Sequence, residues 1–476
     1  GEQVVVGDLP LEVLHGLGRS LTAPAAAATP ASPHGSHVLP PPVYGPRGYR
    51  QVMGDGTARP GRGADAAALD RADPLAAYRE RFVVADDRLV YLDGNSLGRL
   101  PHRAVNLAAE VVRDQWGGRL VRHWNEGWLE VTGRIGDKIG RLVGATPGEV
   151  VLADSTTVCL YKAAVAALRA RPGRGVVVTD DANFPSDIQA LRAAAATVGG
   201  GHTVVVVPGD GVDGPVDAVA DALDDTVALV SLSHVAYRSG WCWDLSATTA
   251  VAHAAGALVL WDLSHSVGVV PIDLGAAKAD LAVGCTYKYL NGGPGAPAFL
   301  YVPHDRPELV NPVAGWQGSD DPFRFDPDAG PAPGVAGFVT GTPPIVSAAL
   351  VEPGVDLVLE AGVDAIRAKS EALTQRFVAL ADGQLASLGF NLATPRDPAR
   401  RGSHVSLTHP DARAVGQALI HEQDTIGDFR PPDMLRYGFA PLYTTYAEVD
   451  AAIQRTAAVV TDGGADRWRG AAPVVP

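Results

Sequence analysis

Cysteine is scarce in this sequence of 476 residues, with only three, at Cys159, Cys242 and Cys285. They are far apart, odd in number and without Cys-x-x-Cys spacing, which argues against a disulfide framework and a structural zinc site. We therefore expect a reducing compartment, the cytoplasm, and no metal centre. No apolar stretch of about 18 residues runs without charged or proline breaks, so we expect no membrane-spanning helix.

Positive charge is also in short supply, because 39 Lys and Arg stand against 53 Asp and Glu, a formal net charge of −14. Polyanion binding needs a surplus of cations on one face, so this balance argues against a nucleic-acid or anionic-membrane partner. Apolar residues make up 46% and charged residues 19%, an ordinary globular composition. A small polar substrate remains compatible with these values.

The first 75 residues differ from the rest, because an Ala-rich run broken by prolines is followed by several glycines. Such a segment buries too little apolar surface to offset its ordering entropy, and we predict a disordered extension over 1–75. The regular pattern that follows divides into a large domain at 76–345, with an N-terminal arm, and a small α+β domain at 346–465. Residues 466–476 are expected to form a tail.

Seven short Val-rich runs alternate with helical stretches in the large domain. Strands that read as continuous apolar runs are buried on both faces, which is typical of a mostly parallel sheet covered by helices. The runs are 150–152, 176–178, 204–207, 227–232, 258–261, 281–283 and 298–302. Beyond 345 the pattern predicts a long helix at 354–380, a strand near 405, a helix at 411–422, strands at 426–429 and 434–437, and a last helix from about 447.

Ligands of open α/β sheets bind outside the carboxyl ends of the strands, and an acid and a lysine follow two neighbouring runs. Asp262 ends the run 258–261, and Lys288 comes after the run 281–283, between two tyrosines and before a Gly-rich loop. Pyridoxal phosphate requires this pair, a lysine for the Schiff base and a carboxylate for the pyridinium nitrogen. The alternative is a helix cap and a surface lysine, which the uncharged surroundings of Lys288 disfavour.

Three other strand ends carry polar side chains that suit the same cofactor. Thr156 and Thr157 open a helix, where backbone N–H groups and hydroxyls bind phosphate, although Ser and Thr are also common helix caps. Phe184, after the run 176–178, suits either the cofactor ring or the core. Ser233 ends the run 227–232. Five strand ends with compatible side chains together favour a pyridoxal phosphate site more than any one of them does.

Several segments closely resemble the kynureninase family over about 76–460. They are YLDGNSLG (91–98), FPSD (184–187), WDLSHS (261–266), TYKYLN (286–291), FVTGTPPI (338–345) and GDFRPP (427–432), which continues through Arg436. The resemblance implies the fold-type I pyridoxal phosphate transferase fold of the class V aminotransferase-like enzymes, a seven-stranded, mostly parallel sheet with helices on both faces and a smaller C-terminal α+β domain. It also implies a homodimer with active sites at the interface.

The activity implied by the resemblance is hydrolysis of the Cβ–Cγ bond of L-kynurenine, or of 3-hydroxykynurenine, to an anthranilate and L-alanine in tryptophan degradation. Lys288 would carry pyridoxal 5′-phosphate as a Schiff base, Asp262 would pair with its ring nitrogen, and Tyr287 would contact its phosphate and move a proton. The other residues implied to bind the cofactor within the chain are Thr156, Thr157, Phe184, Pro185, Ser186, Asp187, Ser233 and His265.

The resemblance further implies that Trp316 and Thr342 reach the cofactor across the dimer interface. Arg436 would bind the substrate carboxylate, a task that a planar guanidinium performs better than lysine. The remaining substrate-binding residues implied are Asn95, Ser96 and Trp124, the last in a loop with His123 and Trp128 that would line the aryl pocket.

Two alternatives remain beside this function. The same scaffold supports other reactions, such as those of an aminotransferase or a cysteine desulfurase, although none of the three cysteines suits a mobile nucleophile. A non-catalytic pyridoxal-binding protein is the second, and the intact Asp262, Tyr287 and Lys288 disfavour it.

Overall fold

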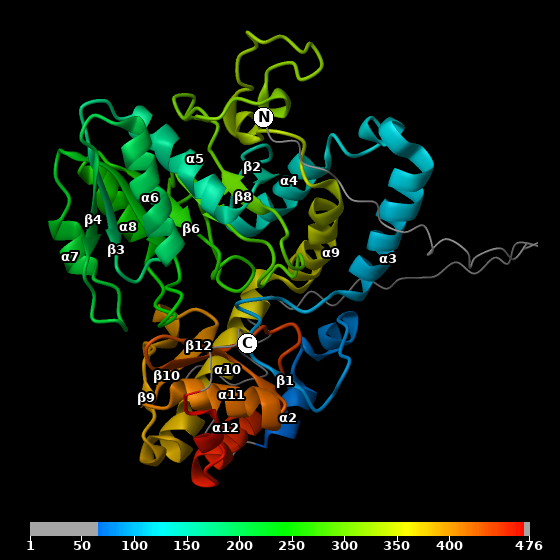
Figure 1. Ribbon diagram of the computed structural model, residues 1–476, viewed down its shortest axis with the longest axis vertical. Coiled ribbons are helices and arrows are strands. Elements are labelled where there is room, and N and C mark those ends of the chain that lie inside the picture. Colours follow the sequence, from blue (N-terminus) through cyan, green and yellow to red (C-terminus); the bar gives the residue numbers. More distant parts are fainter. Residues whose placement is uncertain (1–64, 471–476) are drawn as a thin grey trace, which may run out of the picture. The chain divides into compact units, whose positions relative to one another are not determined.

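Seven strands form the larger sheet in this computed structural model, which describes residues 65–470 (Figure 1). Their order is β2-β8-β7-β6-β5-β3-β4. Strands β4, β3, β5, β6 and β7 are parallel, and β8 runs antiparallel to both of its neighbours. Every predicted run is a strand, so the prediction of a mostly parallel sheet is confirmed. The bounds are β2 Val150–Ala153, β3 Val176–Asp180, β4 Thr203–Val207, β5 Val227–Ser233, β6 Leu258–Asp262, β7 Leu281–Gly284 and β8 Ala298–Tyr301.

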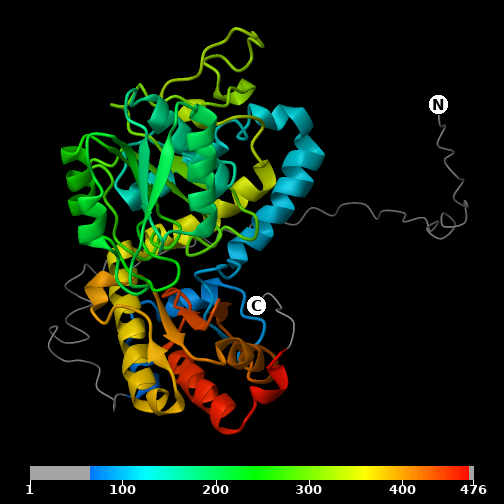
Figure 2. The same cartoon turned by 60° about the vertical axis from the view of Figure 1, so that its left-hand side comes forward.

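Helices cover both faces of this sheet. Along β6, Val259 and Trp261 belong to one apolar core, and Leu258 and Leu260 belong to another. Helices α5 and α6 lie side by side over the second core (Figure 2). Burial on both faces explains why these strands read as unbroken apolar runs. The helices are α4 Val131–Val143, α5 Thr156–Arg169, α6 Pro185–Val198, α7 Val216–Asp221 and α8 Leu245–Ala254.

The C-terminal part has a four-stranded antiparallel sheet of order β12-β13-β10-β9 with its own apolar core. The predicted helix at 354–380 is two helices instead, α9 (Ile345–Ala361) and α10 (Val363–Gln384), because Gly362 breaks the run at a φ of 80°. The predicted strand near 405, the helix at 411–422, the strand at 434–437 and the last helix are present as β10 His404–Thr408, α11 Ala412–Glu422, β13 Met434–Gly438 and α12 Tyr446–Thr461. The predicted strand at 426–429 is two short strands, β11 Thr425–Ile426 and β12 Asp428–Arg430, and β9 Asn391–Leu392 was not predicted.

The segment before the large sheet is more ordered than expected. Helix α2 (Ala66–Ala72) lies inside the predicted disordered extension, whose part at 1–64 is outside the described residues. Asp70 accepts a hydrogen bond from the backbone of Tyr446 (2.7 Å), and Asp73 forms a buried ion pair with Lys369 (2.6 Å). These polar anchors, and not a long apolar run, hold the segment on α10 and α12, so the boundary predicted at 75 is too late.

Short elements complete the described chain. Strand β1 (Val90–Tyr91) pairs in parallel with β11, and α3 (His102–Glu110) continues into a π-helical stretch at Val111–Arg119. The 3-10 turns are Ala76–Arg81, Leu120–Trp124, Trp316–Gly318, Gly334–Phe338, Ala386–Leu388, Pro398–Arg400 and Asp466–Trp468. The last falls in the predicted tail, of which 471–476 is not described. No described helix has the length and apolar character needed to cross a membrane.

Candidate active site

A cavity of about 250 Å³ collects most of the predicted site residues. They arrive from the carboxyl ends of β2, β3, β5, β6 and β7, from the segment after β1, and from the hairpin β12–β13. This is the edge at which an open α/β sheet binds its ligand. The lining residues are Asn95, Ser96, Thr156, Thr157, Phe184, Ser186, Asp187, Ser233, Tyr237, Asp262, Ser264, His265, Tyr287, Lys288, Arg430 and Arg436.

Lys288 lies in this cavity, half-buried, on the loop after β7. Its Nζ is 3.0 Å from Nε2 of His265. Burial, and then the charge of Lys288, hold the pKa of His265 well below its ordinary value. The imidazole is therefore neutral, and its Nε2 accepts the hydrogen bond from the lysine.

Two carboxyl groups face the same space. Asp262 ends β6, and its Oδ1 accepts a hydrogen bond from the backbone N–H of Ser264 (2.8 Å). Asp187 lies in the first turn of α6, and its buried Oδ2 has no hydrogen-bond partner among residues 65–470. Burial, followed by the negative charge of Asp262, raises the pKa of Asp187 well above its usual value. Burial and the neighbouring Asp262 therefore both favour the protonated form of Asp187.

At the start of α5, one residue caps the helix and the next two line the cavity. Ser155 is the cap, since its side chain accepts a hydrogen bond from the backbone N–H of Val158 (3.5 Å). Thr156 and Thr157 line the cavity instead. The first turn therefore offers hydroxyls and backbone N–H groups to an anion.

Phe184 and Ser233 are also oriented toward the cavity. The ring of Phe184 is 38% exposed and contacts Tyr237 edge-on, with centroids 5.0 Å apart. This exposure rules out the core position that the sequence left open. Ser233 donates a hydrogen bond to Asn183 (2.7 Å), whose amide holds β3 and β5 together through Thr179 and Ser231.

Arg436, on β13, is only 1% exposed, and its guanidinium is held on several sides. Nε and Nη2 donate to the two oxygens of Asp428 (2.9 and 2.5 Å). Nη2 also donates to Oγ of Ser96 (2.9 Å), and Nη1 donates to the carbonyl of Tyr237 (2.6 Å). Asn95 lies beside Nε, at 2.8 Å once its amide oxygen faces the arginine. Arg436 is therefore a buried arginine whose guanidinium is fixed by the surrounding protein.

Four predicted residues, Trp124, Pro185, Trp316 and Thr342, do not line the cavity of their own chain. Trp124 packs against Trp316, with centroids 6.4 Å apart, and against Trp128 (5.5 Å). Thr342 is exposed on the segment before α9. Pro185, the first residue of α6, is also absent from the lining. An aryl pocket around Trp124 is therefore not formed within one described chain.

Other lining residues were not assigned a role from the sequence. Ser264 and Arg430 lie within the segments 261–266 and 427–432, and Tyr237 follows Ser233 by four positions, so proximity to these segments was their only signal. Asp428, two positions before Arg430, shares a face of β12 with it and accepts a hydrogen bond from it. Within residues 65–470 no three His, Cys, Asp or Glu side chains gather as a metal ion would require.

Solved structures with the same fold include the apo cysteine desulfurase of Thermococcus onnurineus NA1 (TM-score 0.68, 18% identity, covering 81% of this chain and 98% of that chain). A mutant of C-DES with glycine linked covalently to its PLP cofactor gives a TM-score of 0.69 at 20% identity, covering 80% and 98%. The fold is that of the class V aminotransferase-like pyridoxal phosphate enzymes.

Similarity to curated proteins identifies one family within this class of enzymes. Kynureninase of Pseudomonas fluorescens is 44% identical over 396 residues, 82% of this chain and 93% of the relative. Kynureninase of Burkholderia pseudomallei (strain 1106a) is 44% identical over 397 residues with the same coverage. A family model described as the kynureninase C-terminal domain matches residues 366–456. The chain belongs to the kynureninase family.

Proposed function

We propose that this protein hydrolyses the Cβ–Cγ bond of L-kynurenine to anthranilate and L-alanine, and that 3-hydroxykynurenine is a second substrate, within tryptophan degradation. The observation that carries the proposal is that Lys288, Asp262 and Arg436 line one cavity of a chain 44% identical to kynureninases. One ring hydroxyl changes binding little unless a polar partner is built for it, which supports the second substrate.

Pyridoxal phosphate is the proposed cofactor, bound covalently by Lys288. The cavity fits such a group, since Oδ2 of Asp187 and Nδ1 of His265 are buried with no hydrogen-bond partner in the part of the chain that the structure describes. Thr156 and Thr157 at the start of α5 would hold its phosphate, and Asp262 would pair with its ring nitrogen. When bound, the cofactor supplies an electron sink for negative charge next to the substrate nitrogen.

With the cofactor bound, Lys288 would be the base that takes the proton from Cα of the substrate. A neutral His265, 3.0 Å from Nζ, accepts a hydrogen bond from the lysine without adding a positive charge. This contact keeps the amine directed into the cavity. His265 thus positions the amine of Lys288, and Lys288 transfers the proton.

Arg436 binds the substrate carboxylate. Asp428 accepts from Nε and Nη2, the second hydrogen of Nη2 is donated to Ser96, and one hydrogen of Nη1 is donated to the carbonyl of Tyr237. The remaining hydrogen of Nη1 is the donor for the substrate carboxylate, which receives a charge-assisted hydrogen bond that fixes the orientation of Cα.

Water adds to the γ-carbonyl carbon, and the Cβ–Cγ bond then breaks, leaving the electron pair on Cβ and the carboxylate on the aryl product. Tyr287 donates the proton that Cβ requires. Burial raises the pKa of Tyr287 above its ordinary value, so the phenol holds its proton at neutral pH until Cβ accepts it.

A homodimer with shared sites is the proposed assembly. Apolar side chains are exposed around the segment 112–121, with Val121 74% exposed, and Phe325 is also 74% exposed. Ring contacts connect Trp124 to Trp316, Trp316 to Phe323 and Phe323 to Phe325, and exposed apolar clusters of this kind favour association. Trp124, Trp316 and Thr342 then serve the site of the neighbouring subunit. The three free cysteines support the cytoplasm as the location.

The desulfurase alternative lacks its nucleophile, because the lining of the described cavity includes none of the three cysteines. Cys159 and Cys285 are buried, and burial raises the thiol pKa of both.

Anthranilate fluorescence after mixing the pyridoxal phosphate-loaded protein with L-kynurenine tests the proposal. Wild type is expected to turn over kynurenine without a keto acid, and Lys288→Ala to lose turnover while keeping its circular dichroism spectrum. Lys278→Ala, at an exposed lysine, is the matched control and should match wild type. Turnover by Lys288→Ala, or an absolute need for a keto acid, would contradict the assignment.

A further inference from the structure

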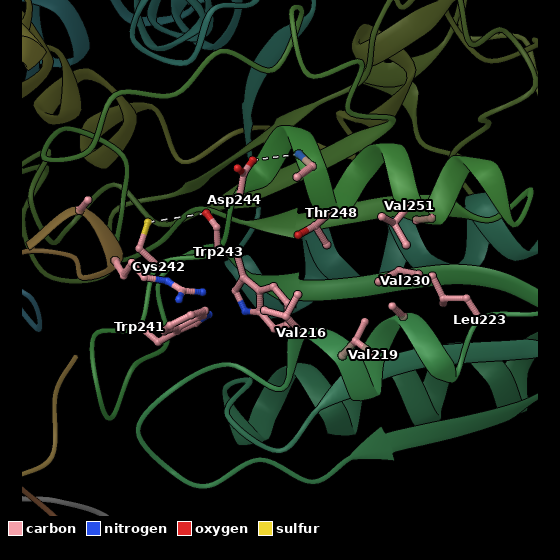
Figure 3. A pocket seen from close by; sticks show the side chains of 15 residues that line it. Val216, Val219, Leu223, Val230, Trp241, Cys242, Trp243, Asp244, Thr248 and Val251 are labelled. Atoms are coloured by element: carbon pink, nitrogen blue, oxygen red, sulfur yellow. Dashed lines mark hydrogen bonds between the residues drawn. The ribbon is translucent and has the colours of Figure 1, made fainter. Parts of the chain in front are cut away.

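A second cavity, of about 470 Å³, is larger than the active site and shares none of its lining residues. It lies between α7 and α8, next to β5, and is closed at one side by the segment Trp241–Asp244 (Figure 3). Nothing in the proposed reaction uses it.

The walls of this second cavity are apolar and deep. Val219, Trp241 and Trp243 are at most 3% exposed, whereas Val216 and Val251 at the mouth are 42% and 46% exposed. The two indole rings meet edge to face, with centroids 6.3 Å apart. Small-molecule sites are clefts of about 300–1,000 Å³ with such linings and few polar groups, and aromatic walls favour an aromatic guest.

One positive charge stands at the mouth. The guanidinium of Arg400 lies 4.2 Å from the centre of the Trp241 ring and has no ion-pair partner within residues 65–470. The nearby carboxylate of Asp244 is occupied as the cap of α8, where it accepts a hydrogen bond from Ala247 (2.8 Å). The buried Nε1 of Trp241 also has no hydrogen-bond acceptor among the described residues. Arg400 is the one cation and Asp244 the one anion that line the cavity, so a ligand with one negative charge can pair with Arg400 beside the apolar walls.

We propose that this cavity binds a small aromatic carboxylate, with the ring between Trp243 and the valines of α7 and α8 and the carboxylate on Arg400. The choice of anthranilate as the probe rests on the proposed function, because anthranilate is the aryl product and belongs to this chemical class. The depth of the walls favours a small molecule over a protein segment, which would need an open groove.

Equilibrium dialysis of the holoenzyme against anthranilate measures the occupancy. Two molecules per chain are expected for wild type, one in each cavity. Val216→Trp, at the exposed mouth, should remove one of them, and Arg400→Gln should weaken the same one about tenfold, since a charge-assisted hydrogen bond is lost. Arg396→Gln is the matched control, an exposed arginine four positions away that pairs with Asp382 (2.8 Å).

Equal binding by wild type, Val216→Trp and Arg400→Gln would overturn the proposal. So would self-association of wild type that Val216→Trp abolishes without any change in anthranilate binding, because the cavity would then be a protein interface. The difference of one molecule per chain between wild type and Val216→Trp is expected whether or not kynurenine is turned over. Failure of the second site is therefore distinguishable from failure of the proposed function.

Discussion

At the scale of single residues, the charges around Arg436 decide what the active site binds. The carboxylate of Asp428 forms an ion pair with the guanidinium of Arg436. Arg430 forms a second ion pair with the same carboxylate. Asp93, only 8% exposed, lies close enough that burial and the charge of Asp428 raise its pKa to about 6. At neutral pH this cluster is balanced, so orientation of Arg436, more than excess charge, selects the substrate carboxylate.

Replacing Arg436 by lysine should raise KM for kynurenine by about tenfold to a hundredfold, with a smaller effect on kcat. An ammonium is a point donor and cannot bond Asp428 through two nitrogens while reaching the substrate. Steady-state kinetics measure the two constants. Arg430→Lys, at a partly exposed side chain, is the comparison and should change KM less; an unchanged KM in Arg436→Lys would remove the assigned role.

Asp93→Asn should raise the free energy of unfolding at pH 7.5 by up to about 3 kcal/mol, the equivalent of a pKa raised from 3.8 to about 6. Between these values the folded chain holds a proton that the unfolded chain has lost, so wild-type stability falls as pH rises. Urea unfolding from pH 4 to 7.5 should show this decline weakened in Asp93→Asn. The exposed Asp87→Asn control should keep the wild-type slope.

At the scale of elements, one glycine separates the two long helices that lead into the C-terminal sheet. Gly362 ends α9 and precedes α10 with a φ of 80°, a conformation that costs an L-residue free energy. A Cβ at this position would meet no atom within 4 Å, so backbone strain alone decides the outcome of a substitution.

Gly362→Ala should lower the free energy of unfolding by about 1 kcal/mol, whereas Gly133→Ala should raise it by a similar amount. Gly133 is exposed within α4, where an added Cβ also meets nothing within 4 Å and alanine favours the helix. Thermal unfolding of the two variants beside wild type gives the comparison. Changes of the same sign in both would show that packing, not φ, controls these sites.

At the scale of the whole molecule, each site is incomplete if Trp316 acts in the neighbouring subunit, as the proposed homodimer requires. The prediction is complementation between two inactive variants, Lys288→Ala and Trp316→Ala. Mixed, dissociated and reassembled, their heterodimers contain one intact site, so about a quarter of wild-type activity should return. Trp468→Ala, at an aromatic remote from both cavities, replaces Trp316→Ala in the control mixture. If no activity returns, either Trp316 acts in the site of its own chain or the protein does not form the proposed dimer.

Contacts between distant parts of the chain explain why helix α2 was not predicted from the sequence. Its short pattern carries no long apolar stripe, and its anchors are Asp70 on the start of α12 and Asp73 on Lys369, partners that lie more than 290 positions away. Local composition cannot show such contacts. The break between α9 and α10 at Gly362 was not predicted either, because the apolar pattern continues on both sides of the glycine.

The sequence by itself determined the large sheet and the Asp262–Lys288 pair, because strands buried on both faces leave unbroken apolar runs and parallel strands end at one edge. Only the tertiary structure decided the carboxylate-binding cluster and the second cavity. Arg436 meets Tyr237 across 199 positions of chain, and Arg400 meets Trp241 from another sheet's loops. Such encounters depend on how separately folded elements pack, which no local pattern of residues records.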